Sequence, residues 1–294
     1  MQGTIVVLDG VSTNRIMLKV QLTAAWYNVV QADRLEGFEA LMRRTRPDLV
    51  LTAMALPDGT AMDVKRLLQT DRSQADVPVL AIAPRNDKAA RLRALAAGLD
   101  DVLVQPYNDN LLLARIRSLL RTSPGAEELR LRNGSQPLGF AEAPAIVNPL
   151  APPALVALFA LRPDTGIAWR DALQPLTRHR VASHGFDQAR AALAGPLPDA
   201  FVVELGRDGA ELNLLADLHA RSAARHTVLI AVLGLNDADL AAAALDRGAD
   251  AALLDGFCAE ELALRLDNRI ARKTRSDYLR APVRKSLLDA TRTG

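Results

Sequence analysis

At 294 residues, the chain is long enough for two domains that each bury a hydrophobic core. Its apolar share of 49% and charged share of 24% are typical of a globular protein, and a net charge of +2 gives no reason to expect that the chain as a whole binds nucleic acid. The single cysteine, Cys258, excludes an internal disulfide framework.

The N-terminal residues MQGTIVVLDG run directly into a strand-like segment. They lack the basic region and the cleavage site of a signal peptide. No apolar run approaches the about 20 residues that a helix needs to cross a bilayer. Because one cysteine also suits a reducing compartment, we expect a cytoplasmic protein without a membrane span.

Short aliphatic runs alternate with amphipathic helical stretches in the first part of the chain. Strands are expected at residues 4–9, 27–31, 48–53, 77–83 and 101–104, with a helix after each. Ser12 or Thr13 is expected to cap the first helix, and Asp109 the last. Five such units predict a parallel sheet covered by helices on both faces.

The second part of the chain repeats this pattern. Gly98 recurs as Gly248, and Arg115 recurs as Arg265, both at a spacing of 150 residues. Strands are expected at residues 154–161, 180–183, 200–205, 227–232 and 251–254. A repeat of this length is a repeat of whole domains rather than of small stacked units.

The expected boundaries are a first domain at 1–121, a linker at 122–153, a second domain at 154–271 and a C-terminal helix at 272–294. Prolines and glycines mark the linker, and Pro282 is expected to kink or break the helix. From Arg265 onward, nine Lys or Arg face three Asp. Such a run could attract nucleic acid, anionic lipid or an acidic partner, but we interpret it as the solvent-facing side of a long helix.

Several motifs of the first copy resemble a response-regulator receiver domain: a Pro-Asp approach to the third strand, a Pro-Asp-Gly turn after it, and an A-G-x-D-D entry to the fifth strand. The pair of copies resembles the tandem receivers of PleD-type response regulators, in which a GGDEF diguanylate cyclase domain follows. The segment RKTRSDYLR is similar to the helix that links receiver and cyclase in that family. The resemblance implies an α/β fold of two flavodoxin-like (CheY-like) (βα)5 domains with an extended C-terminal helix.

The resemblance also implies where phosphate chemistry would lie. Receivers accept a phosphoryl group from a histidine kinase on an aspartate that ends the third strand, beside an acidic pair that holds Mg²⁺, a hydroxyl and a lysine. In the first copy the acidic pair is replaced by Asp9 and Gly10, the acceptor by Ala53, the hydroxyl by Ala83 and the lysine by Gln105. One of the five groups is kept, so we expect neither Mg²⁺ binding nor phosphorylation.

The second copy has also lost most of these groups at the equivalent positions. Ala160 and Leu161 stand at the acidic pair, Val232 at the hydroxyl and Asp255 at the lysine, while Glu204 stands at the acceptor. We therefore expect both receivers to be degenerate, with no catalytic residue, metal or cofactor.

Two surviving carboxylates allow alternatives. Glu204 could imitate an activated acceptor through its permanent charge, but we favour a rim carboxylate that pairs with Arg162. Asp9 could hold a weakly bound metal ion, but we favour a residue that caps the first helix or pairs with a base such as Arg85. In both cases the simpler structural role is the prediction.

Receivers of the resembled family commonly dimerise through the face made by the fourth helix, fifth strand and fifth helix. Here that face would include Arg91, Asp100, Asp101, Arg115 and Arg117. Their opposite charges could pair across a two-fold axis, or remain solvated surface residues. An apolar stripe on the last helix offers a further surface for self-association, formed by Leu262, Leu266, Ile270, Leu279, Val283 and Leu287.

The preferred hypothesis is a non-catalytic module of two-component signalling that acts by phosphorylation-independent dimerisation or protein–protein interaction. Its expected partners are a second copy and other signalling proteins, such as a histidine kinase, a response regulator or a cyclase, and not nucleic acid. The alternative is the N-terminal regulatory half of a PleD-like diguanylate cyclase, cut before its GGDEF domain. A doubly wound α/β enzyme with an unrecognised site is less favoured, because the strand ends carry Ala, Gly, Val and Leu.

Overall fold

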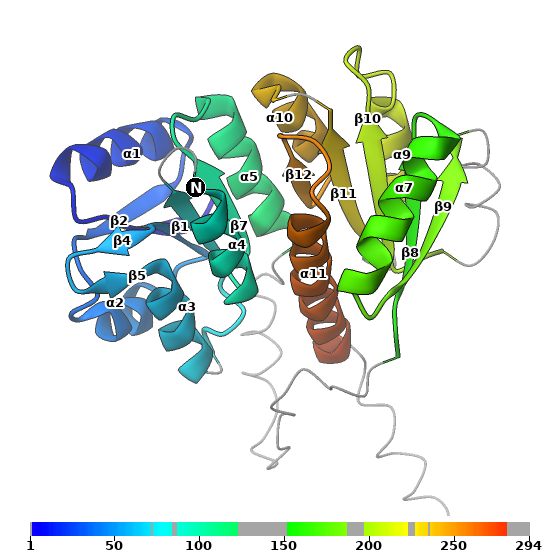
Figure 1. The fold of residues 1–294 in the computed structure, drawn as a ribbon. Coiled ribbons are helices and arrows are strands. Elements are labelled where there is room, and N and C mark those ends of the chain that lie inside the picture. The colour runs from blue at the N-terminus through cyan, green and yellow to red at the C-terminus, as the bar shows by residue number, and fades with distance from the viewer. Residues whose placement is uncertain are drawn as a thin grey trace, which may run out of the picture.

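The computed structural model describes residues 2–71, 73–83, 87–122, 152–186, 197–222, 227–234 and 236–280, without the side chains of 122, 222 and 275–280. Two α/β units of the same design lie side by side (Figure 1). In each, helices cover both faces of a parallel five-stranded sheet, as the tandem repeat predicts.

The first unit forms its sheet in the order β2-β1-β3-β6-β7. Its parallel strands are β1 (Thr4–Leu8), β2 (Asn28–Ala32), β3 (Leu49–Ala53), β6 (Val79–Ala83) and β7 (Asp101–Val104). Its helices are α1 (Ser12–Ala24), α2 (Phe38–Thr45), α3 (Ala61–Thr70), α4 (Lys88–Ala96) and α5 (Asp109–Thr122). A small antiparallel hairpin of β4 (Ala55–Leu56) and β5 (Gly59–Thr60) encloses the predicted Pro-Asp-Gly turn.

The second unit has the strand order β9-β8-β10-β11-β12, which is the same topology. Its strands are β8 (Leu155–Ala160), β9 (Arg180–Gly185), β10 (Ala200–Leu205), β11 (Val228–Leu233) and β12 (Ala251–Leu253). Its helices are α7 (Pro163–Leu173), the short 3₁₀ turn η1 (Gln174–Leu176), α9 (Leu212–Ser222), α10 (Ala238–Asp246) and α11 (Ala259–Arg280). Both units therefore have the 2-1-3-4-5 order of flavodoxin-like folds, which confirms the predicted fold class.

Local sequence explains most of these elements. The central strands are aliphatic runs that are buried on both faces, as in β6, where every residue is buried, whereas the edge strands β2 and β9 are partly exposed. Thr60 and Asp63 form a reciprocal capping box at the start of α3. The repeated Gly98 and Gly248 each follow a fourth helix with φ of 88° and 113°, a left-handed conformation that glycine adopts without strain.

The predicted helix caps, Ser12 or Thr13 for the first helix and Asp109 for the last, were wrong by one or two residues. Val11 is the N-cap of α1, so Ser12 is already helical. The N–H of Val11 finds its acceptor in the Asp9 carboxylate at 2.7 Å. At the start of α5 it is Asn108, not Asp109, whose side chain accepts the backbone N–H two residues on, at 2.7 Å.

The last helix, α11, belongs to the second unit and runs without a break to Arg280. Leu262, Leu266 and Ile270 are buried in the core of that unit, so they are not the self-association stripe that was expected. The remaining stripe side chains and Pro282 lie outside the described residues. Among the described helices, none combines the length and apolar character that a membrane crossing requires.

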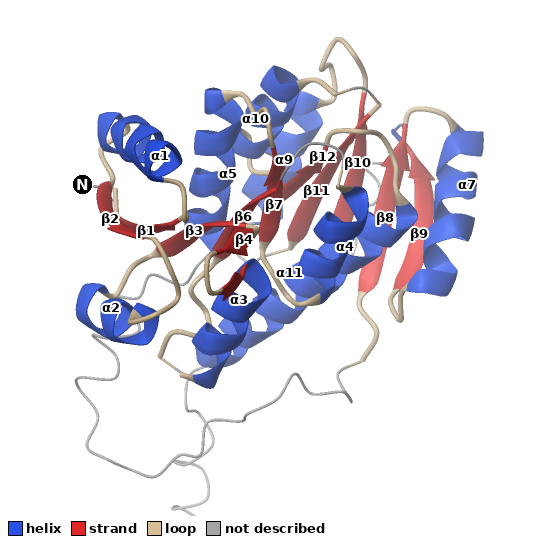
Figure 2. Ribbon diagram, turned by 60° about the vertical axis from the view of Figure 1, so that its left-hand side comes forward, coloured by secondary structure: helices blue, strands red, loops and turns tan. Residues whose placement is uncertain are grey.

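The two units meet along matching surfaces. Strands β7 and β12 are the neighbouring edges of two sheets that follow one another in a single layer (Figure 2). Helix α5 packs on α10, and α4 packs on α11. The contact made by α4, β7 and α5 with α10, β12 and α11 is called the domain seam below.

Candidate functional site

Strand register brings the predicted positions of the first unit to one edge of its sheet. Ala53 pairs with Ile82, and Ala83 pairs with Val104, while the backbone N–H of Gln105 donates to the Ala83 carbonyl at 2.9 Å. This edge is where ligands collect in open α/β sheets. It is lined by two alanine methyl groups and an amide, which supply no group that can accept a phosphoryl.

Asp9, which follows β1, uses its carboxylate within the chain. One oxygen accepts the Val11 N–H at 2.7 Å, and the other accepts from the Asn14 side chain at 3.1 Å. The residue is 5% exposed, so it stabilises the start of α1 as the capping interpretation requires. Arg85, the other suggested partner, lies outside the described residues. Within the described part of the chain, no three His, Cys, Asp or Glu residues lie together as a metal site would require.

Gly10, which stands at the position of the second acid, packs closely against Pro57. A Cβ at Gly10 would lie 2.9 Å from both Cδ and Cγ of Pro57, closer than real Cβ contacts come. A longer side chain at this position would therefore push against the turn that follows β3. The loss of the acidic pair is thus accompanied by close packing of the space.

The second unit keeps one carboxylate at its sheet edge. Glu204 in β10 accepts the backbone N–H of Leu161 at 2.7 Å, where β8 ends and α7 begins. The predicted ion pair with Arg162 is wrong, since the ion pairs between described residues do not include it. Arg162 is the exposed N-cap of α7, and the backbone donor one residue earlier already satisfies the carboxylate.

The strand register also places the other predicted positions of this edge. The acceptor residue Ala53 pairs with Ile82 in the first sheet, and its counterpart Glu204 pairs with Val232 in the second. Val232 is therefore equivalent to Ile82, and the residue equivalent to Ala83 is Leu233. This corrects the alignment by one residue without changing its apolar character. Two further members of the edge are the buried Ala160 and the exposed Asp255.

The residues predicted to form a dimer face lie instead in the domain seam of a single chain. They are Arg91, Asp100, Asp101, Arg115 and Arg117. The side chains of the three arginines contact α10, β12 or α11 of the second unit. The carboxylates of the two aspartates pair with arginines of α11. These groups are therefore not available to pair two copies through the same face in this arrangement.

At the centre of the seam, one carboxylate serves two domains. Asp101 is paired with Arg115 of its own unit and with Arg265 of the second unit, whose Nη1 lies 2.5 Å from Oδ1. Arg265 also contacts Glu261 at 2.9 Å, and Glu261 contacts Arg91 at 3.1 Å. Burial alone would raise the pKa of Asp101, but the two arginines outweigh it and hold that pKa far below its usual range.

The equivalent aspartates, Asp100 and Asp250, differ in their partners. Asp100 pairs with Lys65 at 2.9 Å and with Arg272. Burial would raise the pKa of Asp100, but these two cations lower it to about 2. For Asp250 burial prevails over the charge of Arg269, and its pKa is raised. Of these two aspartates, the one in the first unit, Asp100, is therefore the one that is held charged by ion pairs.

Hydrogen bonds across the seam repeat with approximate two-fold symmetry. Asn268 of α11 donates to the carbonyl of Leu99 at 3.2 Å, just after α4. Arg121 of α5 donates to the carbonyl of Ala249 at 2.9 Å, and Ala249 stands 150 residues after Leu99. Each unit therefore uses its last helix to satisfy the carbonyls that follow the other unit's fourth helix.

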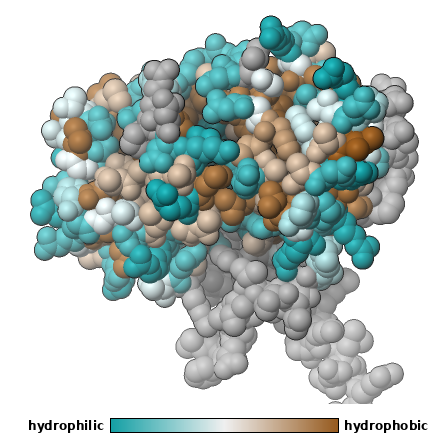
Figure 3. All heavy atoms as spheres, viewed as in Figure 1, coloured by the Kyte–Doolittle hydropathy of each residue, from teal (hydrophilic) through white to brown (hydrophobic). Residues whose placement is uncertain are grey.

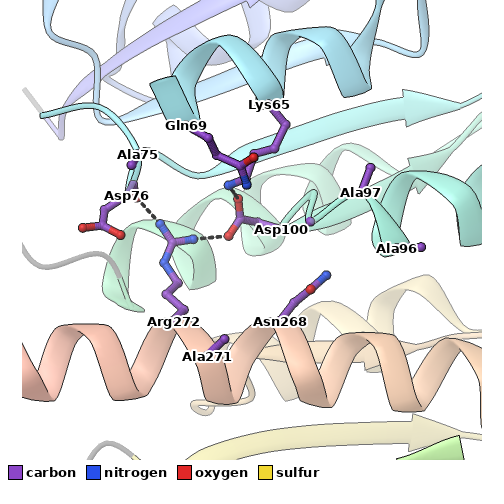
Figure 4. A pocket seen from close by; sticks show the side chains of 11 residues that line it. Lys65, Gln69, Ala75, Asp76, Ala96, Ala97, Asp100, Asn268, Ala271 and Arg272 are labelled. Carbon is purple, nitrogen blue, oxygen red and sulfur yellow. Dashed lines mark hydrogen bonds and ion pairs between the residues drawn. The ribbon is translucent and has the colours of Figure 1, made fainter. Parts of the chain in front are cut away.

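A pocket of about 270 Å³ opens beside the seam, between α3, the end of α4 and α11 (Figure 4). Alanines form much of its wall. Its charged groups already pair with one another, since Arg272 contacts both the Asp100 carboxylate and the Asp76 carbonyl. The two cations that line the pocket, Lys65 and Arg272, are therefore already paired with Asp100.

The sequence did not reveal the role of the basic run on the last helix. Arg265 and Arg269 are 2% and 4% exposed, respectively, so they are buried in the seam and not on a solvent-facing side. The only signal was the repeat of Arg115 as Arg265. That repeat shows a shared position but not which carboxylate it meets.

Comparison with known proteins finds similarity to response regulators. Residues 5–117 match the family described as response regulator receiver domain. Over 285 residues the chain is 29% identical to the response regulator PleD of Caulobacter vibrioides, covering 95% of this chain and 62% of that protein. It is 28% identical over 132 residues to the phosphate regulon transcriptional regulatory protein PhoB of Pseudomonas aeruginosa, covering 45% of this chain and 58% of that protein.

A putative response regulator from Chloroflexus aurantiacus of known structure is 23% identical, covers 40% of this chain and 98% of its own, and has a TM-score of 0.39. The chain spans about three fifths of the length of the first two relatives, 62% and 58%.

Proposed function

Because residues 5–117 form a response regulator receiver domain and the second unit repeats its topology, we propose that this chain is a non-catalytic scaffold of two-component signalling. Two degenerate receivers hold each other in a fixed arrangement, and the module works by protein–protein interaction without phosphate. The proposed extents are the sequence-derived ones, with receivers at 1–121 and 154–271.

The first support for this proposal is the state of both sheet edges. Each keeps one carboxylate, Asp9 or Glu204, and each of these accepts a backbone N–H at the start of the following helix, at 2.7 Å. A hard cation such as Mg²⁺ prefers several carboxylate oxygens that converge on one point. With Ala53 at one acceptor position and backbone-bound Glu204 at the other, such a point is not assembled.

The second support, and the observation that carries the proposal, is the domain seam. The resembled receivers commonly use the face of the fourth helix, fifth strand and fifth helix to pair with another receiver. Here each unit covers that face of the other through α4 with α11 and α5 with α10. A chain built in this way has the paired state permanently, so it does not need a phosphoryl group to reach it.

The proposed partners are signalling proteins, such as a histidine kinase, a response regulator or a cyclase, and a second copy of the chain. Because the seam is occupied, these partners would use the outer surfaces of the pair. Glu204 is proposed to stabilise the start of α7 rather than to imitate an activated acceptor.

The proposal is tested by hydrogen exchange of the whole chain with and without Mg²⁺ and beryllofluoride, which imitates an acyl phosphate. We expect the same protection of the seam helices α4, α5, α10 and α11 in both conditions. A change of protection confined to the samples with beryllofluoride would show a working phosphate switch and contradict the proposal.

A second candidate is the N-terminal regulatory half of a longer PleD-like diguanylate cyclase. One observation favours it: the chain aligns over 95% of its length with PleD but covers 62% of that protein. In this case α11, which packs in the seam and continues to Arg280, would connect the receivers to a following domain. Expression of the full gene and an assay for cyclic di-GMP synthesis from GTP would distinguish the candidates.

A further inference from the structure

The pocket beside the domain seam is built from one face of each of two helices. Lys65 and Gln69 are four residues apart on α3, and Asn268 and Arg272 are four residues apart on α11. Figure 4 shows the first pair pointing from α3 towards α11, and the second pair pointing from α11 towards α3. Because α3 belongs to the first unit and α11 to the second, polar side chains of both domains line one space.

Small residues give this pocket its room. The lining residues without a long side chain are Ala75, Ala96, Ala97, Gly98 and Ala271. The volume that they leave is about 270 Å³, several times the roughly 30 Å³ that one water molecule occupies in the liquid. A small molecule of several non-hydrogen atoms therefore fits.

The fold does not require this space. The 150-residue repeat places Gly248 and Arg121 at the positions of Gly98 and Ala271 on the other side of the seam. A Cβ added at Gly98 would make contacts at 3.6 and 4.0 Å, whereas one added at Gly248 would lie 2.2 Å from Cγ of His219. On that side an imidazole ring occupies the space and an arginine replaces the alanine. The open pocket is therefore a feature of the first unit.

Hydrogen-bond donors in the pocket exceed the acceptors that the chain supplies to them. The side chain of Lys65 is 8% exposed, and within the described residues its ammonium donates one hydrogen bond, to Asp100 at 2.9 Å, so two N–H groups remain. The side chain of Arg272 is 10% exposed, and its Nε has no hydrogen-bond partner in the described part of the chain. The exposed amide of Gln69 makes no hydrogen bond to a described residue either. Because buried donors without an acceptor are costly, this set indicates a ligand that accepts hydrogen bonds.

Positive charge prevails near these donors. Lys65 and Arg272 share one counter-charge, the Asp100 carboxylate, whose oxygens they occupy together with the N–H of Val79. The other carboxylate of the lining belongs to Asp76, and Figure 4 shows it on the far side of Arg272 from Lys65. An anion between Lys65 and Arg272 therefore meets a net positive charge, and it needs to break neither ion pair.

We propose that this pocket binds a small oxyanion, namely phosphate or the carboxylate group of a small metabolite, through Lys65, Gln69 and Arg272. The oxygens of such a ligand accept the hydrogen bonds that these side chains have left to donate, and charge-assisted bonds of this kind are strong. Since the three residues come from two domains, the bound ligand stabilises the domain seam.

This site is separate from the degenerate phosphoacceptor edge. Asp76 and Asp100 precede β6 and β7, whereas Ala83 ends β6 and Gln105 follows β7. The pocket therefore lies at the amino ends of these parallel strands, and the phosphoacceptor edge lies at their carboxyl ends. The inference goes beyond the proposed function, because it gives the scaffold an input from a small molecule.

The test is isothermal titration calorimetry of the whole chain with inorganic phosphate and with malonate, each in a chloride buffer of equal ionic strength. We expect one saturable site per chain. Tighter binding of phosphate identifies a phosphate ligand, and tighter binding of malonate identifies a carboxylate metabolite. Gln69→Glu places a carboxylate in the pocket and Ala271→Leu fills it, so each is expected to weaken binding at least tenfold. Because Gln69 is exposed, Gln69→Glu tests the pocket even if Ala271→Leu disturbs α11.

Two control variants leave the pocket intact. Gln105→Glu makes the first change at the sheet edge, and Ala168→Leu makes the second on an exposed position of α7, so neither should alter the binding constant. Absence of binding of both probes, or binding that Gln69→Glu and Ala271→Leu leave unchanged, would overturn the inference and leave the scaffold proposal standing. Binding weakened by Gln105→Glu alone would place the anion at the sheet edge and contradict both.

Discussion

The guanidinium of Arg265 in the second domain donates to the carboxylate of Asp101 in the first at 2.5 Å, and both side chains are 2% exposed. The same carboxylate also pairs with Arg115. Two buried cations from different domains thus depend on one aspartate. This arrangement makes Asp101 the residue whose loss should weaken the domain seam most.

Asp101→Asn is expected to lower the free energy of unfolding by about 3–5 kcal/mol, because it leaves the buried Arg115 without its counter-charge and Arg265 with Glu261 alone. Urea denaturation of the whole chain measures this loss. The matched control is Asp246→Asn, which breaks the Arg117–Asp246 pair at the rim of the seam, where the two side chains are 42% and 47% exposed. We expect that control to cost less than about 1 kcal/mol. Equal losses for the two variants would show that the buried pair does not hold the seam.

The seam should weaken in acid through Asp100, whose pKa is lowered to about 2 by its cations despite burial. An unfolded aspartate has a pKa of about 3.9, so the unfolded chain binds this proton first as the pH falls. The stability contributed by Asp100 is therefore complete above about pH 4 and is lost as the pH drops towards 2. Comparison of urea midpoints at pH 5 and pH 3 tests this. Asp100→Asn should show a smaller difference between the two pH values than wild type, and an identical difference would refute the assignment.

Asn268→Ala should loosen the end of α4 without unfolding either domain. The side chain of Asn268 donates to the carbonyls of Leu95 and Leu99, two residues that are fully buried. Loss of the donor leaves the Leu99 carbonyl without this partner, at a cost of about 1–3 kcal/mol, whereas the Leu95 carbonyl keeps the Gly98 N–H at 2.9 Å. Hydrogen exchange should become faster at the end of α4 and stay unchanged at the end of α10, which Arg121 serves. Arg121→Ala should give the opposite pattern, and uniform changes in both helices would contradict the symmetry of the seam.

Gly10→Asp is expected to destabilise the first domain by about 1–3 kcal/mol, because the new side chain meets the ring of Pro57. Thermal unfolding measures the loss. Combining it with Pro57→Ala removes the ring atoms in contact and should recover part of the stability. If Gly10→Asp is as stable as wild type, the second acid position is open and the account of a filled edge is wrong.

The fold was predictable from the sequence because its signals are local. Aliphatic runs bounded by turn residues gave the strands closely, and β7 and β10 have the predicted bounds. The 150-residue repeat gave the shared topology, since repeated glycines such as Gly98 and Gly248 mark the same helix end twice. Small errors came where a carboxylate accepts a backbone N–H. Asp9 accepts that of Val11 beside the mispredicted helix cap, and Glu204 accepts that of Leu161 in place of the predicted Arg162.

The seam was not predictable, because buried and solvated charges look alike in a sequence. Asp101 and Arg265 were both recognised, but as a dimer face and as part of a repeated motif respectively. Their pairing depends on how the two domains dock, which brings together residues 164 positions apart. The pairing of α11 with the first domain likewise follows from docking, although each of its arginines is visible in the sequence.

The central claim, that neither receiver takes up phosphate, is tested most directly by the intact mass of the whole chain after incubation with acetyl phosphate and Mg²⁺. The account predicts an unchanged mass for wild type and for Ala53→Asp, since the carboxylate restored in the latter still lacks the second acid and the lysine. A gain of one phosphoryl group by wild type would contradict it.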